Sequence, residues 1–287
     1  MSLAAHSRTP TDIDDGRISK RNFERLASYV YDSYGIKLPP SKMTMVEGRL
    51  RRRVRALKFD SLDSYCDSFF DGGSSADEAI HLANVITTNK TDFFREPNHF
   101  DFLTATVLPK VFAERSGALR VWSAACSTGA EPYTLAMVID DFIAGDPGYS
   151  YSILATDLST DVLDVARRGI YAAEMMEPVP AALRRKYVRD AKDRHASLCR
   201  VAPALRSRVG FARLNLMDKA YPIGRDMDLI FCRNVLIYFD KATQQAVLQK
   251  LLSHLRPGGY LFLGHSESIA GMGLPVHQAA NTIFQHR

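Results

Sequence analysis

Several features that would place this chain in a familiar class are missing from its sequence. No apolar run approaches the roughly 20 residues that a membrane-spanning helix needs, and the first residues lack the apolar segment of a signal peptide. We therefore expect a cytoplasmic protein without direct membrane insertion. The four cysteines include no C-x-x-C pair, which argues against a zinc knuckle and a redox dithiol. We predict that they are buried free thiols.

Metal and phosphate motifs are missing as well. The eight histidines form no H-E-x-x-H or comparable ligand cluster, so we predict no metal, and we treat His265 as structural. The glycine pattern G-x-G-x-x-G does not occur after the first predicted strand, and no Walker lysine follows it. A nucleotide-like ligand would therefore have to be recognised in another way.

What is present is an ordinary globular composition. The chain has 287 residues, 46% of them hydrophobic and 24% charged, which suits one large domain or two modest ones. Its formal charge of +5 favours an anionic partner. That charge alone does not distinguish nucleic acid, an acidic membrane surface and an acidic protein.

The chain divides into two compositional parts. After a polar segment, 1–18, which we expect to be flexible, apolar residues recur at helical spacing through 19–85. A linker and a helix follow in 86–118. From 119 to 287, strand-like and helix-like segments alternate, which predicts a parallel sheet covered on both faces. The segment from about 170 to 208 interrupts that alternation and is rich in arginine and lysine, so it resembles an insertion with its own small structure.

Polar residues follow the predicted strands, where parallel sheets bind ligands. The strand at 119–125 is followed by a loop of small residues that reaches Glu131, with Gly129 allowing close approach of a ligand to the backbone. Asp157 ends the next strand, where it would bind a ribose or only cap the following helix. Asn215 and Asn234 follow two later strands, which together indicate a pocket.

Four runs in this order resemble the chemotaxis receptor methyltransferases (the CheR family). They are Thr87–Glu96 (TTNKTDFFRE), Arg120–Tyr133 (RVWSAACSTGAEPY), Phe231–Phe239 (FCRNVLIYF) and Leu263–Glu267 (LGHSE). The resemblance runs from about Phe23 to the C-terminus. It implies a small all-α domain followed by a Rossmann-like domain that uses S-adenosylmethionine and carries a small inserted β-subdomain.

The same resemblance implies the site residues. The positions that match cofactor contacts are Asn89, Thr91, Arg95, Glu131, Asp157, Asn215, Leu216, Cys232 and Arg233, with Asn234 adjacent. Arg95 and Tyr238 match positions near the reacting centre. From the residues alone, Arg95 would instead form a salt bridge with Glu96 or Asp92, and Tyr238 would pack in the core.

The reaction implied is attack of a glutamate carboxylate on the methyl group, which leaves S-adenosylhomocysteine. A glutamate with a pKa of about 4.3 is already an anion near pH 7, so no general base is assigned. Arg95 is suited to orient a carboxylate because its planar fork binds two oxygens. Tyr238 would donate a hydrogen bond near the methyl group or to the cofactor carboxylate.

The densest basic run lies in 46–55, where Val46, Leu50 and Val54 share one helical face and the arginines spread over the rest. Such a run is usually a solvated helix face. The family resemblance implies instead that Arg49, Arg52 and Arg55 contact the cytoplasmic helices of a receptor, where basic residues would complement Glu-rich segments.

Two further expectations concern partners. The loop near 190–197 lacks the glycines associated with members that bind a receptor C-terminal pentapeptide, so the resemblance does not extend to that tether. We expect a monomer and no nucleic acid. The alternatives are a nucleic-acid methyltransferase, which lacks support because Arg233-Asn234-Val235 is not an Asn/Asp-Pro-Pro-aromatic run, and a non-catalytic sensor that binds S-adenosylmethionine.

Overall fold

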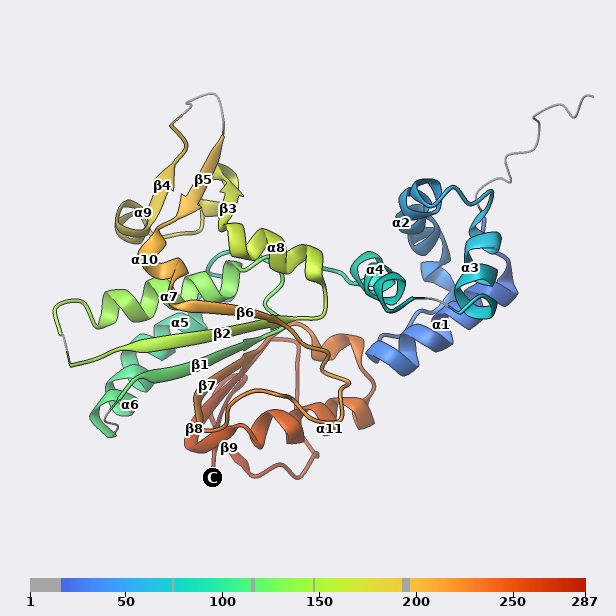
Figure 1. Cartoon of the computed structure of the whole chain (residues 1–287). Helices are drawn as coiled ribbons and strands as arrows, with labels where there is room; N and C mark the ends of the chain where they lie inside the picture. Colours follow the sequence, from blue (N-terminus) through green and yellow to red (C-terminus); the bar gives the residue numbers. More distant parts are fainter. Residues whose placement is uncertain (1–16, 74, 115–116, 147, 193–196) are drawn as a thin grey trace, which may run out of the picture. The chain divides into compact units, whose positions relative to one another are not determined.

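The computed structural model describes residues 17–73, 75–114, 117–146, 148–192 and 197–287. The chain forms two compact units, Met1–Ile86 and Thr87–Arg287. Residues 1–16 of the segment expected to be flexible, and 193–196 of the loop near 190–197, lie outside the described residues. Figure 1 shows the elements of each unit.

The N-terminal unit is helical. Its elements are α1 (Lys20–Tyr34), η1 (Pro40–Lys42), α2 (Met43–Ala56), α3 (Leu62–Asp71) and α4 (Ala76–Ile86). The side chain of Ser19 accepts a hydrogen bond from the Asn22 backbone and begins α1, and Gly35, with φ of 72°, ends it. The buried face of α1 includes Phe23, Leu26 and Val30, the spacing of a helix that packs on one side.

The sequence predicts a helix capped by Ser41 and a third helix that begins at Ser61. The first prediction is wrong in its start, because Ser41 lies inside the short η1 turn and α2 begins at Met43 without a side-chain cap. Ser61 forms a capping box with Ser64, in which each side chain accepts from the other's backbone N–H. Reciprocal capping therefore fixes the start of α3.

The C-terminal unit contains a mainly parallel sheet of seven strands in the order β6-β2-β1-β7-β8-β10-β9. The strands are β1 (Leu119–Ala124), β2 (Tyr151–Asp157), β6 (Val209–Arg213), β7 (Met227–Cys232), β8 (Leu255–Leu263), β9 (Val276–Ala280) and β10 (Ile283–His286). Strand β10 pairs antiparallel with both of its neighbours, and the pairs β1–β2, β1–β7, β2–β6 and β7–β8 are parallel. The strand order reverses between β1 and β7.

Helices cover the two faces of this sheet. They are α5 (Asn98–Phe102), the π-helical turn η2 (Leu103–Val107), α6 (Leu108–Glu114), α7 (Ala130–Phe142), α8 (Thr160–Arg168), the 3-10 turn η4 (Leu236–Tyr238) and α11 (Lys241–Leu252). Alternate residues of β1 belong to two different hydrophobic cores. Val121 lies in the first core, which it shares with residues of α5 to α8, and Trp122 lies in the second core, which it shares with residues of α11. Both faces are buried, as the sequence predicts, because neighbouring side chains of a strand point to opposite sides.

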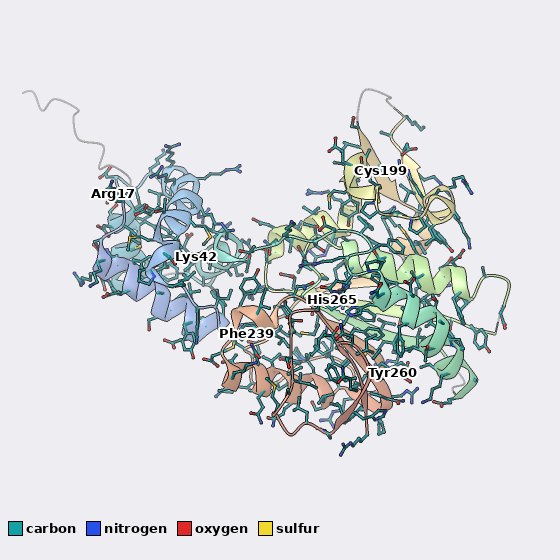
Figure 2. The ribbon with its side chains drawn as sticks, turned by 180° about the vertical axis from the view of Figure 1, so that it is seen from behind. Arg17, Lys42, Cys199, Phe239, Tyr260 and His265 are labelled. Atoms are coloured by element: carbon teal, nitrogen blue, oxygen red, sulfur yellow. The ribbon has the colours of Figure 1, made fainter. Side chains whose placement is uncertain are left out.

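The inserted segment forms a second, antiparallel sheet of three strands in the order β3-β5-β4. Its elements are β3 (Ile170–Ala172), η3 (Ala173–Met176), α9 (Ala181–Tyr187), β4 (Val188–Asp190), β5 (Leu198–Val201) and α10 (Pro203–Arg206). Cys199 lies in its central strand (Figure 2). The predicted fold class, an all-α domain before a Rossmann-like domain with a small β-insertion, is confirmed.

Two elements differ from expectation. The sequence predicts a turn at Pro257-Gly258-Gly259 and a strand from Tyr260, whereas β8 already begins at Leu255. An irregularity between Met227 and Leu229 of β7 accommodates this run. Strand β9 was not predicted.

All four cysteines are buried and form no disulfide bond, as predicted. Among the described residues, no helix is both long enough and apolar enough to cross a membrane.

Candidate active site

The polar residues predicted to form a pocket follow the carboxyl ends of parallel strands. The segment after β1 and the segment after β7 diverge at the point where the strand order reverses, which is where open α/β sheets bind ligands. The ends of β2 and β6 lie on the other side of β1 in the same sheet. The predicted residues from these four strands are therefore brought to one edge.

Asp157, at the end of β2, is almost fully buried and organises the loop after β1. One of its oxygens accepts a hydrogen bond from the Ser127 backbone at 2.8 Å, and the other accepts from the Ser159 backbone at 2.9 Å. The Ser127 hydroxyl donates to the Asn89 carbonyl oxygen at 2.8 Å. Burial raises the pKa of Asp157, and these backbone N–H groups oppose that rise. The bonds join the segment around Asn89 to the ends of β1 and β2.

The backbone is strained at the same edge. Ala125, Ser127 and Asn234 have φ of 74°, 50° and 58°, and Phe94 and Glu96 have φ of 53° and 58°. Side chains other than glycine adopt this left-handed region at a cost of about 1–3 kcal/mol each. Such residues persist where surrounding contacts over-determine them, and they cluster at functional sites.

Arg233 joins three segments through a nearly inaccessible guanidinium. Its Nη1 donates to Glu131 at 3.1 Å, and its Nη2 donates to Glu96 at 2.9 Å and to the Arg95 carbonyl oxygen. Its side chain is 2% exposed, and those of Glu96 and Glu131 are each 12% exposed. The Ser123 hydroxyl also donates to Glu131 at 2.7 Å. A buried charge needs such partners, so the three segments are locked together.

The two carboxyl groups respond differently to this environment. Burial alone would raise the pKa of Glu96, but hydrogen bonds from Asn234 and Arg233 lower it to about 2. Burial raises the pKa of Glu131, and the Arg233 charge and the Ser123 hydroxyl oppose the rise. Glu96 therefore stays an anion throughout the physiological range.

Glu267 fixes the loops after β7 and β8 through backbone groups. Its oxygens accept hydrogen bonds from the N–H groups of Asn234 at 3.0 Å, Leu236 at 2.8 Å and Gly264 at 2.6 Å. Burial raises the pKa of Glu267, and these bonds oppose the rise. Gly264 is required here, because a Cβ would lie 2.4 Å from the Asn234 side-chain nitrogen.

The remaining predicted residues lie around this edge. Arg95 is half-buried and its Nη1 donates to the Lys90 carbonyl oxygen at 3.2 Å, while Glu96 pairs with Arg233. Tyr238 ends the η4 turn after β7 and packs partly against the second core. Thr91 is half-buried in the loop before Arg95.

Asn215 and Leu216 follow β6. The Asn215 side-chain oxygen accepts from the Met217 backbone at 3.0 Å, which shapes its own turn. The Leu216 side chain is buried in the second core with Cys232. Contacts to a ligand from Leu216 and Cys232 would therefore come from their backbone groups.

This donor set fits S-adenosylmethionine. The buried hydroxyl of Ser159, two residues after Asp157, has no hydrogen-bond partner among the described residues, so a polar group is available beside the position where ribose diols bind. Glu131 and Asn215 supply further polar atoms, and the strained loop at Ala125 and Ser127 presents its backbone.

In the N-terminal unit, the three arginines predicted to contact a receptor are not equivalent. The Arg49 Nη1 donates to the carbonyl oxygens of Val85 at 3.2 Å and Ile86 at 2.8 Å, the last residues of α4. Arg52 and Arg55 are exposed on α2. The side chain of Arg49 thus caps a helix, and the other two point to solvent.

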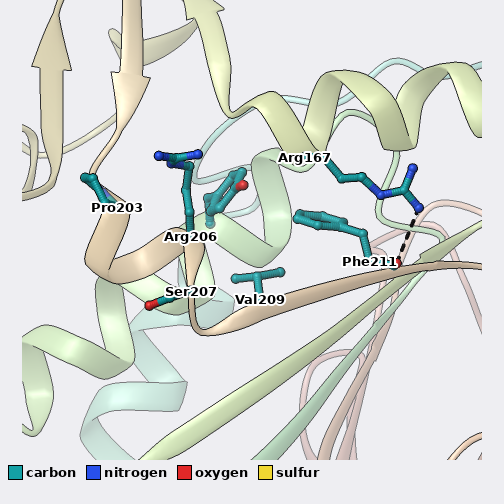
Figure 3. Close-up of a pocket in the computed structure, with 7 residues that line it drawn as sticks. Arg167, Pro203, Arg206, Ser207, Val209 and Phe211 are labelled. Atoms are coloured by element: carbon teal, nitrogen blue, oxygen red, sulfur yellow. Dashed lines mark hydrogen bonds between the residues drawn. The ribbon is translucent and has the colours of Figure 1, made fainter.

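A surface pocket lies elsewhere in the C-terminal unit (Figure 3). Tyr133, Arg167, Pro203, Arg206, Ser207, Val209 and Phe211 line it, and none of them is a predicted site residue. The Arg167 guanidinium on its rim donates to the Phe211 carbonyl oxygen at 3.4 Å.

Sequence reasoning missed four residues that organise the site: Glu96, Ser127, Ser159 and Glu267. Three of them fall inside the runs that carried the family resemblance, but their partners lie far along the chain or are backbone groups. Ser159 follows Asp157, at the start of the helix that Asp157 would cap in the alternative interpretation. The runs therefore included Glu96, Ser127 and Glu267, but the sequence did not show which groups these side chains bind.

The strand order, the reversed strand β10 next to the edge strand β9, and the buried carboxylate after β2 are features of a Rossmann-like sheet with a ligand-binding edge. Two family descriptions match the chain: "CheR methyltransferase, all-alpha domain" over residues 21–87 and "CheR methyltransferase, SAM binding domain" over residues 89–283. The chain therefore belongs to the CheR methyltransferase family.

Curated relatives agree with this assignment. The chemotaxis protein methyltransferase of Salmonella typhimurium is 40% identical over 268 residues, which cover 93% of this chain and 90% of that protein. The protein of the same name from Escherichia coli is 39% identical, with coverage of 93% and 91%. That from Borreliella burgdorferi is 38% identical, with coverage of 88% and 90%.

Proposed function

We propose that this protein transfers a methyl group from S-adenosylmethionine to glutamate side chains on the cytoplasmic helices of chemoreceptors. The products are glutamate methyl esters, formed in sensory adaptation, and S-adenosylhomocysteine. The observation that carries the proposal is similarity to chemotaxis protein methyltransferases over nearly the whole of both chains. The cytoplasm is the compartment in which such a substrate segment is available.

The reaction requires little acid–base catalysis from the protein. S-adenosylmethionine supplies an electrophilic methyl group on a sulfonium centre. A free glutamate, with a pKa of about 4.3, is an anion near neutral pH, so one of its oxygens attacks the methyl carbon while the sulfur keeps the departing electron pair. Alignment and removal of water are what the site contributes, and positioning alone is worth several kcal/mol.

Arg95 is assigned to orient the substrate carboxylate and the cofactor together. Its carbonyl oxygen is held by Arg233, which fixes its backbone beside the ends of β1 and β7. A guanidinium fork suits a carboxylate, but a grip confined to the ground state would slow the reaction. Tyr238 is assigned to donate a hydrogen bond near the transferring methyl group or to the cofactor carboxylate, from the turn that follows β7.

Cofactor binding is assigned to the edge described above. Asp157 and the Ser159 hydroxyl suit the ribose, and contacts to the rest of the cofactor are assigned to polar and backbone atoms of Asn89, Thr91, Glu131, Asn215, Leu216, Cys232 and Asn234. Arg233 acts by holding Glu96, Glu131 and the Arg95 backbone, because its guanidinium is already engaged with these three.

Receptor contact is assigned to the exposed arginines of α2. Arg52 and Arg55 present positive charge that complements Glu-rich receptor helices. Arg49 supports this surface by capping α4. Receptor recognition proceeds without the pentapeptide tether, and the protein acts as a monomer.

The test is methyl transfer from labelled S-adenosylmethionine to cytoplasmic receptor fragments from the same organism. We expect label that mild base releases as methanol, because esters hydrolyse under conditions in which N-methyl groups persist. Transfer to nucleic acid, or base-stable label on protein, would contradict the proposal. Cofactor binding without any transfer would favour the sensor alternative.

The roles of Arg95 and Tyr238 separate in the same assay. Arg95→Ala is expected to lower turnover by at least about 100-fold, because the positioning group is lost, and to weaken binding of S-adenosylmethionine. Tyr238→Phe is expected to lower turnover while cofactor affinity is kept. Unchanged turnover in Arg95→Ala would exclude its role at the reacting centre.

A further inference from the structure

Three side chains to which the proposed mechanism assigns no contact with the substrate or the cofactor lie together beside the active site. Glu96 and His99 are three residues apart around the start of α5, and His265 follows β8, where Figure 2 labels it. One oxygen of Glu96 and one ring nitrogen from each histidine all lie within 4.8 Å of one another. Two imidazoles and a carboxylate are a common set of metal ligands.

One ring nitrogen of His99 contacts a threonine hydroxyl. Its Nε2 lies 3.0 Å from the Thr282 hydroxyl oxygen, and that hydroxyl donates its single proton to the Asn281 carbonyl oxygen at 2.8 Å. With its proton engaged in this way, the hydroxyl accepts from His99 in the tautomer that carries its hydrogen on Nε2, and that tautomer leaves a lone pair on Nδ1.

That lone pair has no partner. His99 is 1% exposed, and its Nδ1 makes no hydrogen bond. It lies 3.6 Å from an oxygen of Glu96, whose carboxylate already accepts from Arg233 and Asn234. In this tautomer two buried acceptors face each other, an arrangement that a cation between them would stabilise.

His265 completes the set from the solvent side. Its backbone N–H donates to the other oxygen of Glu96 at 3.3 Å, which holds the residue in place. Its Nε2 lies 3.9 Å from the oxygen that faces His99, and its side chain is 43% exposed. An ion can therefore reach this ring from solvent.

The distances suit a small ion. Tetrahedral Zn²⁺ with ligands at 2.0–2.1 Å places ligand atoms about 3.3 Å apart. The Glu96–His99 separation of 3.6 Å and the Glu96–His265 separation of 3.9 Å are close to this value, and the histidine ring nitrogens, which lie within 4.8 Å of each other, would come closer by movement of the exposed His265 ring. Arg233 shares the same Glu96 oxygen, but a carboxylate oxygen has two lone pairs, and Glu131 also balances the Arg233 charge.

We propose that Glu96, His99 and His265 form a binding site for one divalent ion of the Zn²⁺, Co²⁺ and Ni²⁺ class. Imidazole ligands favour these ions over Mg²⁺ and Ca²⁺, which prefer all-oxygen sites. The bond from His99 to Thr282 is the outer contact that orients a metal-bound histidine. The expectation of no metal considered only ligands close in sequence, whereas His265 is 169 residues from Glu96.

The test is calorimetric titration of the chelator-stripped full chain with ZnCl₂, in the absence of S-adenosylmethionine. We expect saturable binding of one ion per chain. His265→Ala should weaken that affinity by more than about 100-fold, since loss of an outer contact alone costs 10–100-fold. His277→Ala, which removes an exposed histidine of β9, should leave it unchanged. The absence of saturable binding, or equal affinities in the two variants, would overturn the proposal.

A measurement on the unsubstituted protein covers the case in which His265→Ala does not fold. Diethyl pyrocarbonate modifies accessible histidine nitrogens, and mass spectrometry locates the modified residues. Zn²⁺ should protect His265 and leave the modification of His277 unchanged. Equal modification of His265 with and without Zn²⁺ would refute the site. Neither readout requires methyl transfer, so failure here is distinguishable from failure of the proposed function.

Discussion

At the scale of single residues, Arg233 illustrates how one buried side chain joins several segments of a site. It meets two carboxylates and a carbonyl oxygen that come from α7 and from the loop before α5. A planar guanidinium can satisfy these directions at once because its donors are arranged as a fixed fork. An ammonium group keeps the charge but not the geometry.

We therefore predict that Arg233→Lys destabilises the C-terminal unit by about 2–3 kcal/mol, since charged hydrogen bonds in a buried site are lost. For a unit of this size the apparent Tm of its transition should fall by roughly 5–10 °C. Affinity for S-adenosylmethionine should fall as well, because the Arg95 backbone is released. Differential scanning calorimetry and a binding titration would measure both effects.

The matched control is Arg185→Lys, which changes an exposed arginine of α9 in the same way. Its Tm and cofactor affinity should match those of the unsubstituted protein. If Arg233→Lys and Arg185→Lys behaved alike, the bridging role of Arg233 would be wrong.

Among the elements, α2, α3 and α4 are joined by one carboxylate. Glu78 on α4 accepts two bonds from Arg53 Nε at 3.2 Å, one from Arg53 Nη2 at 2.5 Å, and one from the Tyr65 hydroxyl of α3 at 2.8 Å. Its side chain is 14% exposed. Burial would raise the pKa of Glu78, but the bonds from Arg53 and Tyr65 outweigh it and lower the pKa.

A lowered pKa makes the stability of the N-terminal unit depend on pH. The folded carboxyl binds its proton less readily than the unfolded one, so its stabilisation is complete above the ordinary value of 4.5 and is lost as pH falls through the folded value. We predict that Glu78→Gln destabilises this unit by about 1–3 kcal/mol at pH 7. The difference from the unsubstituted protein should shrink as the pH falls below 4.5.

Thermal unfolding followed by circular dichroism between pH 3 and 7 would measure this difference. Glu24→Gln is the control, because Glu24 is exposed on α1 and its Lys20 contact spans 3.9 Å. A destabilisation by Glu78→Gln that is constant across this pH range would show that the ion pair does not contribute through its charge.

The elements also show which parts of the secondary structure the hydrophobic pattern predicts. The sequence predicts a strand over Met227–Cys232, and β7 has these bounds, because a short apolar run bounded by polar segments within a strand–helix alternation is typical of a buried strand. Local turn preference failed at Pro257-Gly258-Gly259, which lie inside β8 at an irregularity between the pairs Met227–Leu255 and Leu229–Tyr260. Ser41 and Ser61 were both predicted to begin a helix. Only Ser61 has a reciprocal partner, Ser64, with which it forms a capping box.

The candidate site, like the fold, could be predicted only in part from the sequence. The position of Asp157 at a strand end follows from the alternation of strands and helices, because carboxyl ends of parallel strands share an edge. The pairing of Glu96 with Arg233 spans 137 residues and depends on the tertiary fold. The capping role of Arg49 was likewise hidden, since nothing in a basic run distinguishes an arginine that binds carbonyl groups from one that faces solvent.

At the scale of the whole molecule, the effect of the net charge of +5 depends on where the charged side chains are exposed. Arg52 and Arg55 present two of these charges on α2. Opposite charge on a receptor raises the rate of encounter, and salt screens this effect because the Debye length falls from about 10 Å at 0.1 M to about 3 Å at 1 M. Receptor methylation should therefore depend on ionic strength, whereas binding of S-adenosylmethionine should depend on it weakly.

We predict that Arg52→Ala combined with Arg55→Ala lowers kcat/KM for receptor fragments by roughly 10-fold at low salt, through slower association. The deficit should shrink as salt is added, and affinity for S-adenosylmethionine should be unchanged. Arg21→Ala combined with Lys37→Ala removes the same charge from exposed positions outside α2 and should have a small effect. A deficit that is equal for the two double variants would mean that net charge, and not the α2 surface, steers the receptor. Equal kcat/KM for the α2 variant and the unsubstituted protein at every salt concentration would exclude receptor contact through these two arginines.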